Sequence, residues 1–131
     1  MRHEESDNAI ALMQWAELRS VALPQLAYLF HVPNGGRRNV IEAQRMKREG
    51  VKAGVPDYLL PWRVGDRVGV AFELKSLTGR ITNDQVWWLS HYANQGWLSF
   101  IARDWQVAAS TLENYLLDRP ITDASRLILF H

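Results

Sequence analysis

Apolar and polar residues follow one another along the chain in patterns that predict alternating helices and strands. Over residues 5–19 the apolar side chains recur at helical spacing, which predicts a first helix. The apolar run 26–32, "LAYLFHV", is typical of a short buried strand. Asn39 can cap a following helix that stops at Gly50, because asparagine favours the first and glycine the last of these positions.

The second half of the chain begins with a predicted β-hairpin. Its reversal is expected at residues 64–66, because Gly65 and Asp66 tolerate the backbone angles of a tight turn. Four more elements are expected beyond it: a helix from Thr82 to about Gly96, a strand at 97–102, a helix capped by Asp104 that ends near Leu117, and a strand at 126–130. This succession predicts one mixed α/β domain over residues 1–131.

The hairpin carries charges at one end, where apolar strands do not need them. If the reversal centres on Gly65, the numbers of facing residues sum to about 130, so that Asp57 faces Glu73. Lys75 lies two residues after Glu73 and therefore projects from the same face of the strand. Pro61 indicates an edge position or a bulge in the first arm, because proline cannot donate to a sheet ladder.

Two interpretations of this charged end remain open. It forms an ion pair at a strand end, or Asp57 and Glu73 hold a divalent cation while Lys75 polarises an attacking water. The strand around Glu73 is strongly apolar, and burying charges is costly unless they are compensated. Under the second interpretation these charges have a function, which is to bind a cation and to polarise water.

Composition narrows the class of protein. The chain has 131 residues, 47% of them hydrophobic, with six Trp and no Cys. A chain of this length can bury one core, while the lack of Cys excludes disulfides and thiolate zinc sites. No apolar run is long enough to span a membrane, and the polar N-terminus does not resemble a signal peptide. We therefore expect a cytoplasmic protein that does not interact with membranes.

Positive charge gathers in one segment, residues 37–52, although the net charge is only +1. Arginine outnumbers lysine twelve to three in the chain, and arginine suits bidentate contacts with phosphate. A solvated helix face explains the segment equally well. Asn34, in the loop "PNGG" (33–36), is a further candidate contact that turn chemistry alone also explains. The candidates for DNA contact are thus Asn34, Arg37, Arg38, Arg45 and Arg48.

Asp57 followed by Glu73-x-Lys75 resembles the core of the PD-(D/E)XK nucleases, and Pro56 supplies the first letter of that signature. The surrounding segments are more specific: "PNGG" (33–36), "REGVKAGVPDYLLP" (48–61), "FELKSLTGRITNDQVWWL" (72–89) and "QGW" (95–97). Together they resemble the VRR-NUC branch, in the small stand-alone form found in phages and bacteria. The resemblance implies a restriction-endonuclease-like α/β fold with a mixed central sheet flanked by helices, in a protein of a bacterial or phage-infected cell.

The resemblance also implies roles for individual residues. Lys75 matches the catalytic lysine. A Mg²⁺ or Mn²⁺ cofactor is implied, with ligands from Glu5, Asp57, Glu73 and the carbonyl of Leu74. Glu5 is chosen over Glu4 because it stands ten residues before Trp15, although Ala9 occupies a position where many members carry glutamine.

Gln85 has two possible roles. It matches a glutamine of the family's active site, but Thr82 and Gln85 also fit a capping box, in which the glutamine side chain accepts from the threonine amide. The two roles compete for one side chain.

The resemblance implies a metal-dependent endonuclease that cleaves DNA phosphodiester bonds. Small stand-alone members are similar to Holliday-junction resolvases, so we expect a homodimer selective for branched DNA, since twofold protein symmetry matches that of a junction. Duplex DNA is also a possible substrate. The alternative is a DNA-binding or assembly module with an inactive nuclease-like site, and an RNA-directed nuclease is a third possibility.

Overall fold

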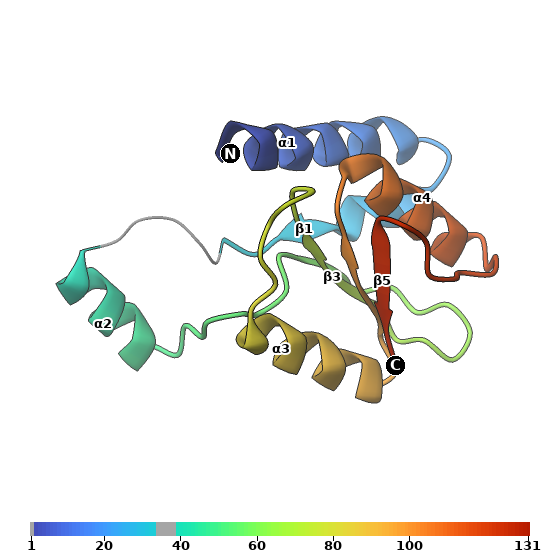
Figure 1. Ribbon diagram of the computed structural model, residues 1–131. Coiled ribbons are helices and arrows are strands. Elements are labelled where there is room, and N and C mark those ends of the chain that lie inside the picture. The colour runs from blue at the N-terminus through green and yellow to red at the C-terminus, as the bar shows by residue number, and fades with distance from the viewer. Residues whose placement is uncertain (1, 34–38) are drawn as a thin grey trace.

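A five-stranded mixed sheet forms the centre of the protein in a computed structural model, which describes residues 2–33 and 39–131 (Figure 1). The strands follow one another across the sheet in chain order: β1 (Phe30–His31), β2 (Tyr58–Leu60), β3 (Val70–Leu74), β4 (Leu98–Ala102) and β5 (Leu127–Phe130). Only β3 and β4 run parallel, joined by a crossover helix, and the other neighbours are antiparallel. The expected mixed sheet is confirmed.

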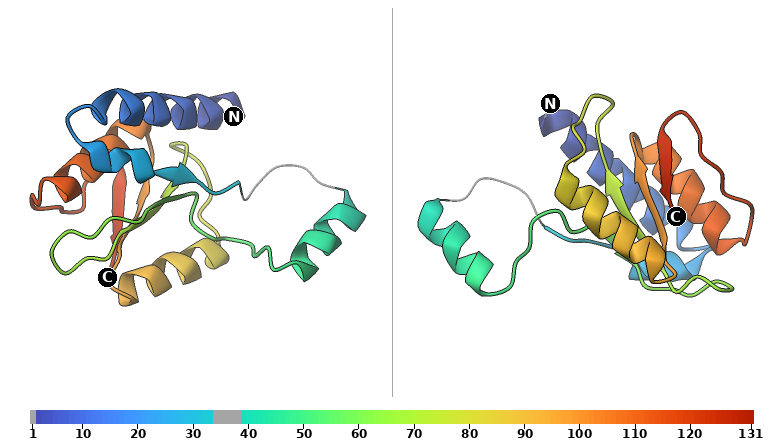
Figure 2. Two further views of the ribbon diagram at one scale, coloured as in Figure 1. Left: turned by 180° about the vertical axis from the view of Figure 1, so that it is seen from behind. Right: turned by 60° about the horizontal axis from the view of Figure 1, so that its bottom comes forward.

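Helices cover both faces of this sheet (Figures 1 and 2). The long α1 (Arg2–Arg19) and α4 (Trp105–Leu116) pack on one face, and the crossover helix α3 (Asn83–Asn94) lies on the other. The remaining α-helix, α2 (Val40–Arg48), stands away from the sheet in Figures 1 and 2, and none of its residues is buried. Among the described residues, no helix is long and apolar enough to cross a membrane.

The core under α1 and α4 is centred on three aromatic rings from neighbouring strands. Tyr58 of β2 stacks on Phe72 of β3 with ring centroids 5.0 Å apart, and Phe72 stacks on Phe100 of β4 at 4.8 Å. All three side chains are buried, and they stand directly opposite one another in the strand register. Such cross-strand pairs stabilise a single register, because a slip of one residue would turn each ring to the other face.

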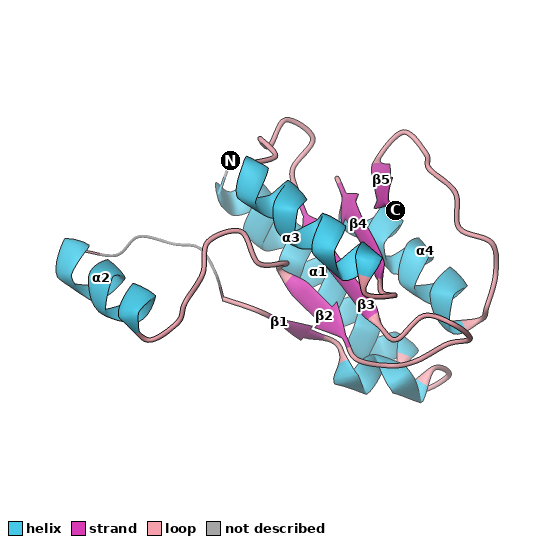
Figure 3. Cartoon of the chain, turned by 90° about the horizontal axis from the view of Figure 1, so that it is seen from below, coloured by secondary structure: helices cyan, strands magenta, loops and turns pink. Residues whose placement is uncertain are grey.

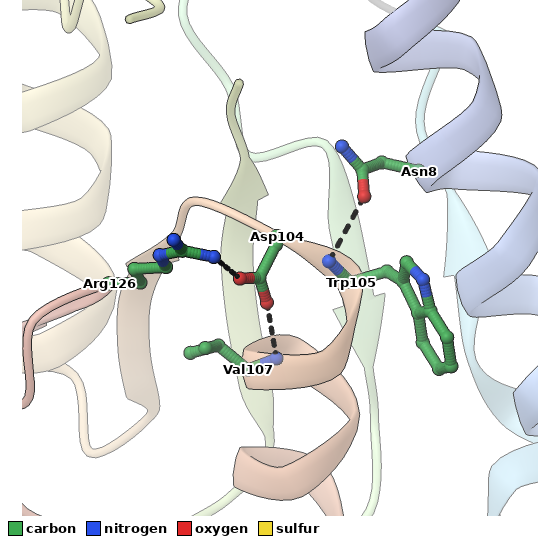
Figure 4. A network of polar contacts seen from close by, with 5 residues as sticks. All are labelled: Asn8, Asp104, Trp105, Val107 and Arg126. Atoms are coloured by element: carbon green, nitrogen blue, oxygen red, sulfur yellow. Dashed lines mark hydrogen bonds and ion pairs between the residues drawn. The ribbon is translucent and has the colours of Figure 1, made fainter. Parts of the chain in front are cut away.

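A polar network ties α1 to the beginning of α4 (Figure 4). Asp104 caps α4 by accepting from the Val107 amide at 2.8 Å, and it pairs with Arg126 at 2.8 Å. Asn8 of α1 accepts a hydrogen bond from the Trp105 amide at 3.2 Å. The first turns of α1 are thus held beside α4, on the sheet face that carries Phe72.

Local capping signals in the sequence are confirmed. The Asn39 side chain accepts from the Glu42 amide at 2.7 Å, and α2 is followed by Gly50 at φ +102°. At α3, Thr82 and Gln85 form both hydrogen bonds of the capping box, at 2.9 and 3.2 Å. Each bond satisfies a backbone donor that the helix start would otherwise leave unpaired.

The prediction of a buried strand over residues 26–32 is wrong in most of its length. Residues Pro24–Tyr28 form a 3₁₀ helix, η1, and the strand that follows has only two residues, both exposed. Pro24 begins η1, where its missing N–H leaves no donor unsatisfied. Leu26 within η1 and Leu29 directly after it are buried in the core, and a run of apolar residues does not by itself distinguish this arrangement from a strand.

The hairpin has the predicted register but shorter arms. Tyr58 pairs with Phe72 and Leu60 with Val70, so facing numbers sum to 130. Beyond these pairs, an isolated bridge joins Val64 to Arg67 around Gly65 at φ +57°. Pro61 lies just after β2, in a stretch where its arm holds one more residue than the partner arm, so the ladder ends at Leu60.

The loop that leads into β2 packs tightly on the start of α3. A Cβ atom added at Gly54 would lie 2.5 Å from the Cβ of Asp84, and Gly54 has φ +84°. The indole of Trp88 donates to the carbonyl of Ala53 at 3.1 Å. These contacts fix the backbone three residues before Asp57.

We predict that Gly54→Ala destabilises the protein more than Gly50→Ala does. Both sites have positive φ, which costs a side chain about 1–2 kcal/mol. Only at Gly54 would the new Cβ also meet another atom within 4 Å. The overlap should add about 1–3 kcal/mol to the loss in the free energy of unfolding, measured by urea denaturation. Equal losses in the two variants would show that the contact with α3 is not tight.

Candidate active site

The hairpin register brings two carboxylates together on the sheet face that α3 covers. Tyr58, Phe72 and Leu74 point into the core under α1. Side chains alternate between the two faces along a strand, so Asp57 and Glu73, their neighbours in the sequence, point to the opposite face. Continuing the observed pairing by one position sets Asp57 opposite Glu73. The expected juxtaposition of the two carboxylates therefore follows from the observed register.

Glu73 is the most unusual of these groups. Its side chain is 1% exposed, and neither carboxylate oxygen has a hydrogen-bond partner among the described residues. Burial raises the pKa of Glu73 well above its usual range. Asp57 raises it further, because a second carboxylate close by favours the protonated, uncharged form of Glu73. Lys75 opposes the rise through its positive charge.

Asp57 is half-buried and is held at both its backbone and its side chain. Its Oδ2 accepts from the Leu74 amide at 3.3 Å, and its carbonyl accepts from the Val32 amide at 2.6 Å. The carboxylate is thereby tied to the strand that carries Glu73. One edge of this pair of carboxylates remains open to solvent at Asp57.

Lys75 lies just beyond the end of β3 and is half-buried. Its amide donates to the carbonyl of Ala102 at 2.8 Å, which extends the parallel pairing with β4 by one residue. Its ammonium group forms no ion pair with any residue that the structure describes. The geometry thus does not support a simple ion pair at the strand end, and it leaves the Lys75 ammonium free to meet a substrate.

Arg103 holds the loop after Lys75 and was not singled out from the sequence. Its guanidinium donates to the carbonyls of Ser76 and Gly79 at 2.8 Å each and to that of Leu77 at 3.3 Å. The loop therefore closes around one side chain from the end of β4. Arginine at that position carried no signal in the sequence, because the contact joins residues 24 to 27 positions apart.

The donor set at this site suits a divalent cation. The two facing carboxylates offer hard oxygen ligands, which Mg²⁺ and Mn²⁺ prefer. The oxygens of Glu73 are available for a cation, because no described residue donates a hydrogen bond to them. Within residues 2–33 and 39–131, however, no cluster of three acidic or histidine side chains is assembled. Glu5 is exposed on α1. Helix α1 packs on the face opposite to Glu73, so Glu5 could join the two carboxylates only around the end of the sheet.

Three of the remaining candidates lie on helices α2 and α3. The Gln85 side chain is engaged in the capping box of α3. Arg45 and Arg48 are exposed on α2, as expected for residues that contact a partner or solvent. Asn34, Arg37 and Arg38 lie outside the described residues.

Comparisons with known proteins bear on the fold and the family of the chain. A model of the VRR-NUC domain matches residues 3–105, which include both carboxylates, Lys75 and Arg103. A solved structure described as a VRR_NUC domain protein has the same fold, with a TM-score of 0.73 over 93% of this chain and 95% of that one. Its sequence is 24% identical to this chain. No curated protein matches.

We predict that the metal-free protein loses stability as the pH rises from about 5 to 8. Folded Glu73 retains its proton over this range, whereas unfolded Glu73 releases it near the ordinary value of 4.5. Because the folded state binds more protons, the free energy of unfolding falls with rising pH, by at most about 1.4 kcal/mol per pH unit from this group. Glu73→Gln should remove that part of the slope, measured by urea denaturation in EDTA.

The control for this prediction is the same titration with Mg²⁺ present. A cation that binds the ionised form of Glu73 should reduce the slope in the wild type and have no such effect in Glu73→Gln. A wild-type slope that matches the Glu73→Gln slope in EDTA would contradict the prediction.

Proposed function

The chain belongs to the VRR-NUC domain family, and from this premise we propose that it is a divalent-metal-dependent endonuclease that hydrolyses phosphodiester bonds in DNA. Family membership implies a nuclease-type function with DNA as the substrate. The observation that carries the finer proposal is the buried carboxylate of Glu73, which faces Asp57 and has no hydrogen-bond partner among the described residues. An inactive binding module has no need of so costly a group.

In this proposal Asp57 and Glu73 hold Mg²⁺ or Mn²⁺, with the Leu74 carbonyl as a further ligand. When bound there, the cation would supply Lewis acidity to the phosphate and would lower the pKa of a bound water. Lys75 orients that water and stabilises the negative charge that develops on the phosphate oxygens. Its ammonium suits this role because no described carboxylate holds it in an ion pair. Arg103 positions Lys75 by holding the loop that follows it.

Two further residues are proposed with different support. Helix α1 packs on the face opposite to the two carboxylates. Glu5 therefore completes the ligand set only if the first turns of α1 and the end of the sheet that carries Asp57 move toward each other. Gln85 contributes to the site only by leaving the capping box that it forms with Thr82. We propose its main role as capping α3.

We propose that residues 1–131 act as one domain. The family model ends at residue 105, where α4 begins, and the rest of α4 together with β5 completes the same structure. Leu112 and Tyr115 of α4 are buried in the main core, and β5 pairs with β4.

We further propose that the protein acts as a homodimer on branched DNA. Apolar side chains stand exposed on α2 and α3, among them Val40, Ile41 and Trp87, and an exposed apolar surface of this kind favours contact between copies. Two sites related by twofold symmetry suit the two equivalent strands of a four-way junction.

The central prediction is that cleavage requires both a divalent cation and Lys75. In a nuclease assay with Mg²⁺ or Mn²⁺, Lys75→Ala should lower kcat by about 100-fold or more, because it removes a charge that stabilises the transition state. Calorimetry should show that Lys75→Ala still binds Mn²⁺, whereas Asp57→Ala does not. Full cleavage in EDTA, or by Lys75→Ala, would contradict the mechanism.

The same assay defines the substrate when it is run on a four-way junction, a flap, linear duplex and RNA. Paired symmetric cuts in the junction, sparing of linear duplex, and a solution mass near twice 15.1 kDa would support the dimeric resolvase. If the protein is a monomer that cuts linear and branched DNA equally, it is still a metal-dependent nuclease, but the proposal of a dimeric resolvase is wrong. Binding to junctions without cleavage of any substrate would favour the inactive module instead.

We predict that Arg45 and Arg48 on α2 contact phosphates. The double variant Arg45→Ala, Arg48→Ala should weaken DNA binding across sequences and reduce the slope of log K against log salt by about 2. The fold should be unaffected, since α2 buries none of its residues. Arg119→Ala, which removes an exposed arginine next to α4, serves as the control. An unchanged slope in the double variant would make α2 a solvated helix only.

A further inference from the structure

The sheet face that carries the two carboxylates continues onto β1, where it presents a phenyl ring to solvent. Phe30 pairs directly with Leu59, and Leu59 pairs with Ala71. These three residues share the face of Asp57 and Glu73, because Tyr58 and Phe72 point to the other side. Phe30 is the diagonal neighbour of Asp57 on this face, which sets their side chains about 7–8 Å apart.

Helix α3, which lies on this face of the sheet, does not extend over this part of it (Figure 3). Figure 3 shows the sheet from the side of α3, and β1 and β2 lie clear of α3 there. Phe30 is accordingly 46% exposed, although it sits on a sheet face whose central residues are buried. A substrate bound at the open side of Asp57 would therefore lie within reach of this phenyl ring.

More aromatic surface lies at the other end of the same two strands. Tyr28 and Trp62 are 58% and 38% exposed and stack on each other with ring centroids 5.9 Å apart. The carbonyl of Trp62 accepts from the hydroxyl of Tyr115 at 2.7 Å, which holds this segment against α4. The backbone that carries Trp62 is therefore anchored to α4.

The charges around these rings favour a polyanion. Apart from Asp57, the stretches 28–33 and 57–63 contain no acidic residue. Arg63 follows Trp62 and is exposed, without an ion-pair partner among the described residues. An aliphatic patch would suit a protein partner, whereas exposed aromatic rings beside cations are typical of surfaces that bind single-stranded nucleic acid.

We propose that Phe30 is a stacking surface for an unpaired nucleobase next to the cleavage site, and that the pair of Tyr28 and Trp62 receives a further base at the far end of the same two strands. The proposal rests on the proposed nuclease function and adds to it the class of substrate: DNA with unpaired or splayed nucleotides beside the scissile phosphate. Bases inside a duplex are stacked on each other and cannot offer a free face to Phe30. Only a nucleotide released from the duplex can stack there.

Binding is measured by fluorescence anisotropy in the Lys75→Ala background, with Mg²⁺ and either a short fluorescein-labelled thymidine strand or a fully paired duplex. Adding Phe30→Ala should weaken single-strand binding by about tenfold or more, the loss expected for one stacked base. Duplex binding should change by less than about twofold, since it depends on phosphate contacts. Phe30→Tyr should bind as Phe30 does, and Phe30→Leu should bind as weakly as Phe30→Ala.

Ile128→Ala is the matched control, because Ile128 is 41% exposed on β5 at the opposite edge of the same sheet. The proposal is overturned if Phe30→Leu keeps wild-type single-strand affinity, if Ile128→Ala loses as much, or if Phe30→Ala halves the solution mass, which would make this face a contact between copies. Because the assay needs no cleavage, its outcome is separate from that of the nuclease. If the protein cleaves DNA but the Phe30 variants bind the single strand as tightly as the wild type does, only the proposed stacking surface is refuted.

Discussion

A carboxylate buried without a hydrogen-bond partner is the feature on which the rest of this structure depends. Glu73 lies in the central strand of the sheet, and its oxygens meet no donor among the described residues. Removing such a group from water without a partner disfavours its charged form, so the remainder of the fold must outweigh that cost. Asp57, which faces it, makes the charged form less favourable still. A divalent cation between the two carboxylates would reverse both effects, and for this reason we propose a metal centre at this position.

The fold stabilises this site from the opposite face of the sheet. The stacked rings of Tyr58, Phe72 and Phe100 fix the register of three strands, and the same register sets Asp57 opposite Glu73. Two loops are then held individually, the one before Asp57 by close packing of Gly54 on α3 and the one after Lys75 by Arg103. The strands thus supply the position of the charged groups, and the loop contacts limit their movement.

Local signals in the sequence predicted much of this fold, while contacts distant in sequence were not accessible from it. The hairpin register could be predicted because one reversal at Gly65 determines every facing pair, and the capping residues act within one helical turn. The stretch 26–32 could not, because apolar letters alone do not separate η1 from a strand. Within the candidate site, facing carboxylates followed from strand geometry, whereas the role of Arg103 depends on a parallel strand pairing that brings residues 76–79 beside it. The position of Glu5 depends on where α1 packs, which its own helical pattern does not specify.

The most direct test of the metal centre is a crystal structure of the protein with Mn²⁺, in which anomalous scattering locates the ion independently of any assay of cleavage. The account predicts one or more anomalous peaks at coordination distance, about 2.2 Å, from carboxylate oxygens of both Asp57 and Glu73. It predicts that these peaks disappear in crystals of Glu73→Gln. Mn²⁺ bound elsewhere, with the carboxylates of Asp57 and Glu73 free of metal, would contradict the account.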